Sequence, residues 1–134
     1  MYLLETNVVS ELRRVRPHGA VLAWIAAVPD VGLHLSAVTI GELQTGVERT
    51  RDRDPRKAAE LEAWFAQVAA GYAILPMDGA AFREWARLMH KRSDTLAQDA
   101  MIAATAIIHN LTVATRNVRD FEPLGARTFN PFEE

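Results

Sequence analysis

Short apolar runs alternate along the chain with longer stretches whose apolar residues recur at helical spacing. The short runs predict strands, and the helical spacing predicts amphipathic helices packed against them. We expect strands at 2–4, 33–36, 72–75, 111–115 and 126–129. We expect helices at 7–15, 20–28, 37–49, 55–68, 79–91 and 96–109. Strands separated by helices favour right-handed crossovers. The pattern therefore predicts an α/β fold, a three-layer α/β/α sandwich with a mainly parallel sheet of four to five strands.

Polar residues suited to capping precede several of the expected helices. Thr6 or Asn7 can cap the first helix. Asp78 can cap the helix that begins at 79. Thr95 followed by Gln98 matches a capping box at the start of the helix near 96. These residues set the expected helix boundaries.

The composition narrows the class of protein. The 134 residues fit a single domain, 1–134, and 49% hydrophobic residues supply a packed core. No apolar run is long enough to span a bilayer, and the start lacks the basic region of a signal peptide. With no cysteine, disulfides and cysteine-ligated zinc are excluded, and a cytoplasmic location is expected. The net charge of −2 does not suit a general nucleic-acid coat, although arginines cluster locally.

Acidic and polar residues recur where the expected strands end. Glu5 directly follows the first strand, and Glu42 lies within two turns of the start of the helix after the second. Asn117 and Asp120 follow the fourth strand, and Asp99 lies in the first turn of the helix near 96. Ligands bind at the carboxyl ends of strands in open parallel sheets. These side chains are therefore expected at one rim of the sheet.

Asp99 is the most informative of these residues, because it is the only charge in the otherwise apolar segment 96–108. Burying a lone carboxylate is costly unless it is paired or binds a metal. The alternative is that Asp99 only supports the helix N-terminus, and Glu42 and Glu5 could be ordinary surface charges. Three carboxylates at one rim would repel one another without a cation. An oxygen-only set suits Mg²⁺, with Mn²⁺ as a substitute.

Four segments in order resemble the motifs of a known family. They are MYLLETNVVSEL at the start, LSAVTIGELQTG from Leu35, DAMIAATA from Asp99 and LTVATRNVRDF from Leu111, with FNPF near the end. Together they resemble PIN-domain proteins, specifically the VapC-type and FitB-type toxins of bacterial toxin–antitoxin pairs. The resemblance covers essentially the whole chain.

The resemblance implies a Mg²⁺-dependent endoribonuclease that hydrolyses RNA phosphodiester bonds with a metal-activated water. The family's three acids fall on Glu5, Glu42 and Asp99. Its variable fourth position falls on Asn117, with Asp120 the nearest available carboxylate. The implied polar helpers are Thr6, Asn7 and Thr115. The implied phosphate contacts are Arg13, Arg14 and Arg116. The implied partners are a cognate antitoxin, the RNA substrate and a second copy in a homodimer. Promoter DNA would be contacted only through the antitoxin, and no membrane is involved.

One position departs from the family, which almost always has Asp where this chain has Glu5. The side chain is longer by one methylene, about 1.5 Å. Glu5 either binds metal after local adjustment or lowers activity, and it could also be an introduced substitution. The main alternative is thus a catalytically impaired PIN-fold module that binds its antitoxin and RNA.

Two further alternatives belong to other classes. A DNA-directed nuclease stays open, because metal chemistry does not distinguish sugars. A receiver-like signalling domain is disfavoured, because no suitably placed Lys follows a later strand. The apolar faces that carry Trp64, Phe65 and Trp85 suit either core packing or contact with a partner.

Overall fold

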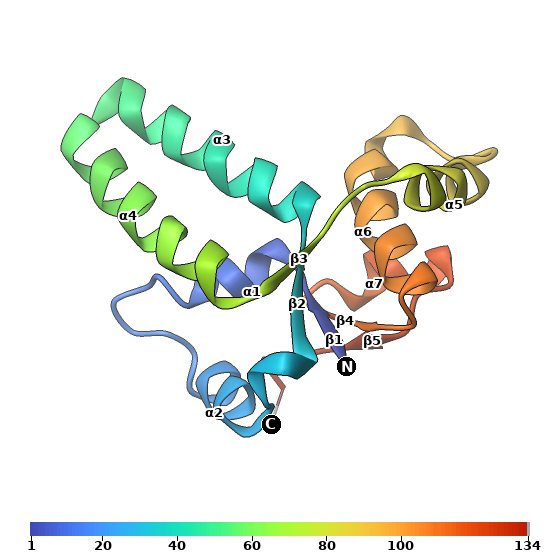
Figure 1. Ribbon diagram of the computed structural model, residues 1–134, viewed down its shortest axis with the longest axis horizontal. Helices are drawn as coiled ribbons and strands as arrows, with labels where there is room; N and C mark the ends of the chain where they lie inside the picture. The colour runs from blue at the N-terminus through green and yellow to red at the C-terminus, as the bar shows by residue number, and fades with distance from the viewer. Residues whose placement is uncertain (134) are drawn as a thin grey trace.

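A parallel sheet lies at the centre of the computed structural model, which describes residues 1–133 (Figure 1). The sheet has five strands in the order β3-β2-β1-β4-β5, and each pairing is parallel. The strands are β1 (Tyr2–Leu4), β2 (Leu33–Ser36), β3 (Ala73–Leu75), β4 (Thr112–Ala114) and β5 (Thr128–Phe129). The expectation of a mainly parallel sheet of four to five strands is confirmed. The order puts β1 in the middle, so the residue after it lies between the ends of β2 and β4.

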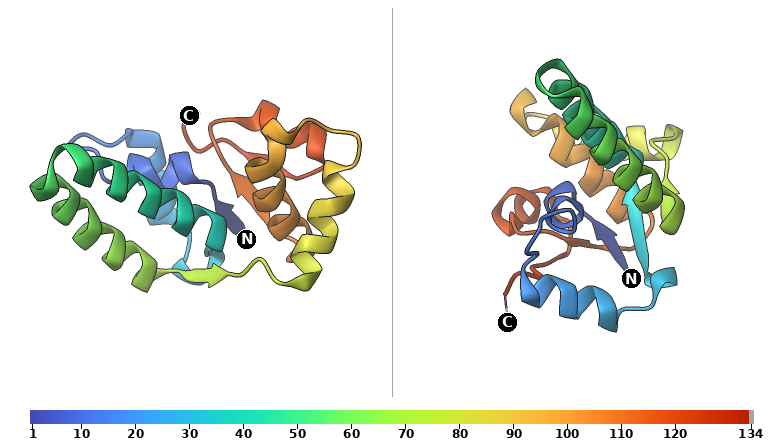
Figure 2. Two further views of the ribbon diagram at one scale, coloured as in Figure 1. Left: turned by 90° about the horizontal axis from the view of Figure 1, so that it is seen from above. Right: turned by 90° about the vertical axis from the view of Figure 1, so that its left-hand side faces the viewer.

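Two helical layers cover the faces of the sheet. One layer comprises α5 (Gly79–Met89), α6 (Ala97–Ile108) and α7 (Val118–Phe121), and the other α1 (Thr6–Glu11), α2 (Gly19–Ala27), α3 (Ala37–Arg53) and α4 (Pro55–Gly71). Successive strand residues point to opposite faces. Leu3 and Val113 accordingly pack with the first layer, and Leu4 and Leu35 pack with the second. The left view in Figure 2 shows the α3–α4 pair on the opposite side from α5 and α6. The three-layer α/β fold is confirmed.

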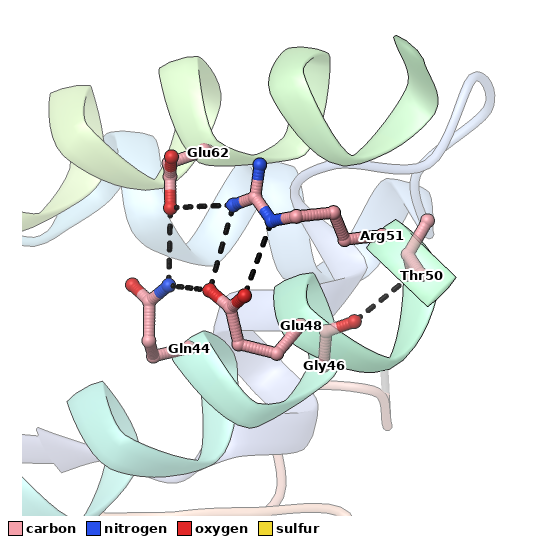
Figure 3. A network of polar contacts seen from close by, with 6 residues as sticks. All are labelled: Gln44, Gly46, Glu48, Thr50, Arg51 and Glu62. Carbon is pink, nitrogen blue, oxygen red and sulfur yellow. Dashed lines mark hydrogen bonds and ion pairs between the residues drawn. The ribbon is translucent and has the colours of Figure 1, made fainter. Parts of the chain in front are cut away.

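The α3–α4 pair extends away from the sheet as an antiparallel hairpin (Figure 1). Helix α3 continues to Arg53, beyond the expected end at 49, and Asp54 caps α4 by accepting a 3.1 Å hydrogen bond from the backbone of Lys57. A polar network joins the two helices (Figure 3). In it, Arg51 donates to Glu48 and Glu62, and Gln44 donates to the same two carboxylates.

The start and end of α1 differ from the sequence expectation. Glu5, rather than Thr6 or Asn7, is the N-cap, because its extended backbone lets its carboxylate accept the Asn7 backbone N–H at 2.7 Å. The helix ends at Glu11 rather than near 15. The buried Glu11 carboxylate accepts the backbone N–H of His18 at 2.9 Å. This hydrogen bond ties the start of α2 to the end of α1 across the loop between them.

The expected capping box at Thr95 is wrong. Ser93 caps a short 3-10 helix, η2 (Asp94–Leu96), and the Thr95 hydroxyl contacts the Ser93 hydroxyl at 3.0 Å. Helix α6 then continues directly from η2, with Leu96 at its N-cap position and no side-chain cap. The preceding turn of helix therefore replaces the capping side chain. The Asp78 cap of α5 is confirmed, with a 3.0 Å hydrogen bond from the backbone of Ala81.

Three aromatic residues of the two helical layers, Trp64, Phe65 and Trp85, pack against neighbouring apolar residues. Phe65 is 7% exposed and contacts Val47 and Ala58 in a small core cluster, with Trp64 partly buried beside it. Trp85 packs on the first layer and donates its indole N–H to the carbonyl of Ala97 at 2.9 Å. Phe65 and Trp85 therefore serve core packing, whereas Trp64 is only partly buried and also lines a hollow. Within residues 1–133, no helix is both long and apolar enough to cross a membrane.

Candidate active site

Four carboxylates reach the carboxyl edge of the sheet from different elements. Glu5 follows β1, and Glu42 lies in the second turn of α3, which begins where β2 ends. Asp99 lies in the first turn of α6, and Asp120 lies on α7 after β4. Helix α6 precedes a parallel strand and so runs back across the sheet, which places its N-terminus at this same edge. Glu5 is electrostatically coupled to the other three acids.

Glu5 occupies the most buried position of the four. Its backbone N–H continues the sheet by donating to the Ala114 carbonyl at 3.0 Å, and its side chain is 7% exposed. Burial raises the pKa of the Glu5 carboxyl from 4.5 to about 7. The Asn7 N–H opposes this rise in pKa, whereas the negative charges of Glu42, Asp99 and Asp120 add to it. The carboxyl therefore exchanges its proton near neutral pH.

Asp99 and Glu42 lie farther out on the same rim, where both are partly buried. Burial raises the pKa of the Asp99 carboxyl, and the neighbouring charges of Asp120 and Glu42 raise it further. The expectation from the apolar helix is confirmed for the body of α6, since 102–106 is buried. Asp99 itself lies at the partly open end of that helix. Burial accounts for most of the rise in both pKa values, and the repulsion from the neighbouring acids is the part that a cation would relieve.

A hydroxyl pair holds Glu42 in place. The Thr6 hydroxyl lies 2.9 Å from Oε1 of Glu42 and 3.1 Å from the hydroxyl of Thr39. Each hydroxyl carries one proton. The Thr6 hydroxyl is the donor in both contacts, so its one proton is shared between Glu42 and Thr39. Thr39 is fully buried, and these contacts connect α1 to α3 beside the Glu42 carboxylate.

Asn7 joins the ends of β1 and β4. Its side-chain amide donates to the Thr115 hydroxyl at 3.4 Å, and its side-chain oxygen accepts the backbone N–H of Arg116 at 3.3 Å. The Thr115 hydroxyl also accepts the backbone N–H of Asn117 at 2.9 Å. Asn7 and Thr115 thus set the backbone that presents Asn117, whose side chain is exposed at this edge.

The three arginines expected near phosphate are placed differently from one another. Arg13 lines a hollow that also contains Glu42. Arg14 instead pairs with the buried Glu11 at 3.5 Å. The Arg116 guanidinium lies 3.7 Å from the centre of the Phe132 ring. Arg13 thus shares a hollow with Glu42, and Arg116 shares a second hollow with Asp120 and Asn117.

The donors at this edge are carboxylate, hydroxyl and amide oxygens, which are the ligands that Mg²⁺ and Mn²⁺ prefer. In the described part of the chain, no three His, Cys, Asp or Glu side chains are close enough together to hold a metal ion as they stand. Two of the acids are engaged by the protein instead, Glu5 by the Asn7 N–H and Glu42 by the Thr6 hydroxyl. The residues fit a hard cation by their donor chemistry and by their coupled charges.

Two buried polar residues at or near the site were not singled out as functional from the sequence. Thr39 lies one turn before Glu42 on α3, so the helical spacing was the available signal. Glu11 is 5% exposed and shapes the loop after α1. Nothing in the local sequence distinguishes Glu11 from a surface glutamate, because its partner His18 is seven residues away.

Known proteins share both the sequence and the fold of this chain. A family model described as PIN domain matches residues 2–125. The VapC ribonuclease Y4jK of Sinorhizobium fredii is 40% identical, with 99% of each chain covered. Toxin FitB of Neisseria gonorrhoeae is 36% identical, with 100% of each chain covered. The crystal structure of FitAcB from Neisseria gonorrhoeae matches with a TM-score of 0.89 and 34% identity over 100% of both chains.

Proposed function

Because the chain belongs to the PIN-domain family, we propose that it is a metal-dependent endoribonuclease and the toxin of a toxin–antitoxin pair. The observation that carries the proposal is the carboxylate edge, where burial, together with the negative charges of Glu42 and Asp120, raises the pKa values of Glu5 and Asp99. The names of the relatives, a VapC ribonuclease and Toxin FitB, support the choice of RNA as substrate and of toxin as role.

We propose Mg²⁺, with Mn²⁺ as a substitute, as the cofactor held at this edge. Glu5 and Asp99 would be the principal ligands, and Asn117 and Asp120 would complete the set. When bound, the cation supplies a water of lowered pKa and neutralises charge on the phosphodiester. A bound cation would favour the deprotonated forms of Glu5 and Asp99, because its positive charge offsets the burial and the neighbouring negative charges that raise their pKa values.

Glu42 has a separate task in this proposal. Its Oε1 is oriented by the Thr6 hydroxyl, and its charge faces the partly open rim. From there the Glu42 carboxylate would accept a proton from the attacking water. Thr6 and Thr39 are positioning residues, because they act on the reaction only through Glu42.

The decisive experiment compares Asp99→Asn with the matched control Asp94→Asn. Asp94 lies on η2, five positions earlier, and is exposed. With a single-stranded RNA substrate and Mg²⁺, Asp99→Asn should lose cleavage, whereas Asp94→Asn should retain it. Cleavage by Asp99→Asn at the wild-type rate would remove Asp99 from the mechanism. The same oligonucleotide made as DNA tests the nuclease alternative, and we expect it to be left intact.

The proposed role implies specific partners. We propose a cognate antitoxin, a homodimer and contact with promoter DNA only through the antitoxin, all in the cytoplasm. These partners follow from the family to which the chain is similar. Co-expression with a candidate antitoxin, sought among the neighbouring reading frames, followed by size-exclusion chromatography, would test both the complex and the dimer.

A second candidate function rests on the hydrogen bond between Glu5 and Asn7. The Glu5 carboxylate is engaged as the cap of α1, and it is one methylene longer than the residue the family usually has. A chain impaired in this way would be a PIN-fold module that binds antitoxin and RNA without cleaving. If neither the wild type nor Glu5→Asp cleaves RNA while both still bind it, the binding module is favoured over the ribonuclease.

A further inference from the structure

A groove runs from the carboxylate edge along the α3–α4 hairpin. It encloses about 240 Å³ between α1 and the hairpin, and Glu42 and Thr6 line the end nearest the acids. Arg53 lines it at the far end of α3, eleven residues from Glu42. Eleven residues are close to three helical turns, so both side chains lie on the same face of α3, about 16 Å apart. The groove therefore continues the candidate active site in one direction.

The walls of this groove carry cations that have no internal ion pair. Arg13, Arg53 and Lys57 line it and are exposed. The ion pairs found within residues 1–133 use other cations of the chain, namely Arg14, Arg51, Arg56 and Arg87. Three unpaired cations thus converge from the turn after α1, the end of α3 and the start of α4. Their combined charge is complementary to a polyanion.

The floor of the groove is apolar and partly aromatic. Leu43, Leu61, Trp64 and Phe65 line it between the charged walls. Trp64 is only partly buried and lines the groove, so it is accessible from there. Basic walls beside an accessible aromatic side chain are the combination that binds single-stranded nucleic acid, because the walls take the phosphates and the ring takes a base.

We propose that this groove binds the single strand of RNA that leads away from the cleavage point, with Arg53 and Lys57 contacting its phosphates. The proposal rests on the proposed ribonuclease function and adds a substrate-binding surface to it. An acidic peptide could satisfy the same cations. A phosphodiester strand is favoured because the groove opens directly beside Glu42, where a phosphodiester has to be placed for cleavage.

The test measures RNA binding separately from cleavage. The protein carries Asp99→Asn and is kept in EDTA, so that no cleavage occurs. The probe is a fluorescein-labelled single-stranded RNA of roughly twelve nucleotides, within the size range of single-strand sites. Arg53→Gln/Lys57→Gln is compared with Arg56→Gln/Arg83→Gln, which removes the same charge from exposed positions outside the groove. Fluorescence anisotropy gives the Kd over a series of salt concentrations.

We expect the groove variant to bind RNA roughly ten- to thirtyfold more weakly at 0.1 M salt, with a salt slope shallower by about 1.4, because two phosphate contacts are lost. The control pair should match the parent. Equal affinity and slope for groove and control variants would overturn the proposal. Poly-glutamate serves as a second probe in the same assay. If the groove variant binds RNA like the parent but no longer binds poly-glutamate, the groove is a protein-binding surface and the proposal is wrong. RNA binding could depend on the groove while the protein that retains Asp99 fails to cleave RNA. That result would support the groove as an RNA-binding surface and would refute the proposed ribonuclease function.

Discussion

The backbone N–H of Asn7 donates a 2.7 Å hydrogen bond to Oε2 of Glu5, so the most buried acid of the site is also the cap of helix α1. The same carboxylate is thereby drawn toward the start of α1. Because the helix N-terminus carries partial positive charge, it partly compensates a negative charge that burial disfavours. The chain has combined a structural contact and a candidate ligand in one side chain.

Shortening this side chain should improve catalysis. Asp is also a good N-cap, so Glu5→Asp should keep α1 while it withdraws the carboxylate by about 1.5 Å. Since errors of about 1 Å can cost on the order of 100-fold in rate, we expect RNA cleavage to rise by roughly 10- to 100-fold. Initial rates with Mg²⁺ measure the change. Glu5→Gln, which keeps the length and removes the charge, serves as the control without gain. A slower Glu5→Asp variant would mean that the site is matched to glutamate.

The raised pKa of Glu5 predicts how stability depends on pH. Its folded-state pKa of about 7 exceeds the value of 4.5 for an ordinary glutamate. Between these values the folded state holds more protons than the unfolded state, so stability falls as pH rises from about 4.5 to 7. Ionisation of Glu5 lowers the free energy of unfolding by up to about 3 kcal/mol over this range. The raised pKa of Asp99 acts in the same direction.

Urea unfolding in EDTA at several pH values tests this dependence. Glu5→Gln cannot ionise, so its stability should rise relative to the wild type as the pH increases through this window. A constant difference between the two proteins from pH 4.5 to 7 would show that Glu5 titrates normally.

Mg²⁺ should stabilise the folded protein. A ligand at 100 times its Kd adds about 2.7 kcal/mol, which corresponds to a rise in Tm of roughly 5 to 10 °C for a domain of this size. The effect should be smaller at pH 5 than at pH 8, because ligand carboxyls must lose their protons. Thermal unfolding monitored by fluorescence measures it. Asp94→Asn should respond like the wild type and Asp99→Asn should not, whereas equal responses would place the cation elsewhere.

Glu11 should matter for stability although it lies outside the carboxylate edge. Its buried carboxylate accepts the backbone N–H of His18 at 2.9 Å. Glu11→Leu leaves that donor without its partner and should cost about 1–3 kcal/mol. Glu11→Gln keeps an accepting oxygen and should cost less. The midpoint of urea unfolding measures both, and equal stability of Glu11→Leu and the wild type would contradict the structural role.

Local sequence determined the elements whose signals are contained within a few residues. The strand at 33–36 was predicted to the residue, and Asp78 caps α5 as expected. The layered parallel fold followed from the alternation of strands and helices. The acids at the strand ends were found in the same way, because parallel strands bring their carboxyl ends to one edge.

Only the tertiary structure decided which side chains are free to act. Arg14 was expected near phosphate, but the buried Glu11 pairs with it. The α3–α4 hairpin brings Arg53 and Lys57 to the groove that Glu42 also lines. The pKa of Glu5 is likewise raised mainly by burial. Burial and partner choice depend on contacts between residues distant in sequence, so no local pattern could contain them.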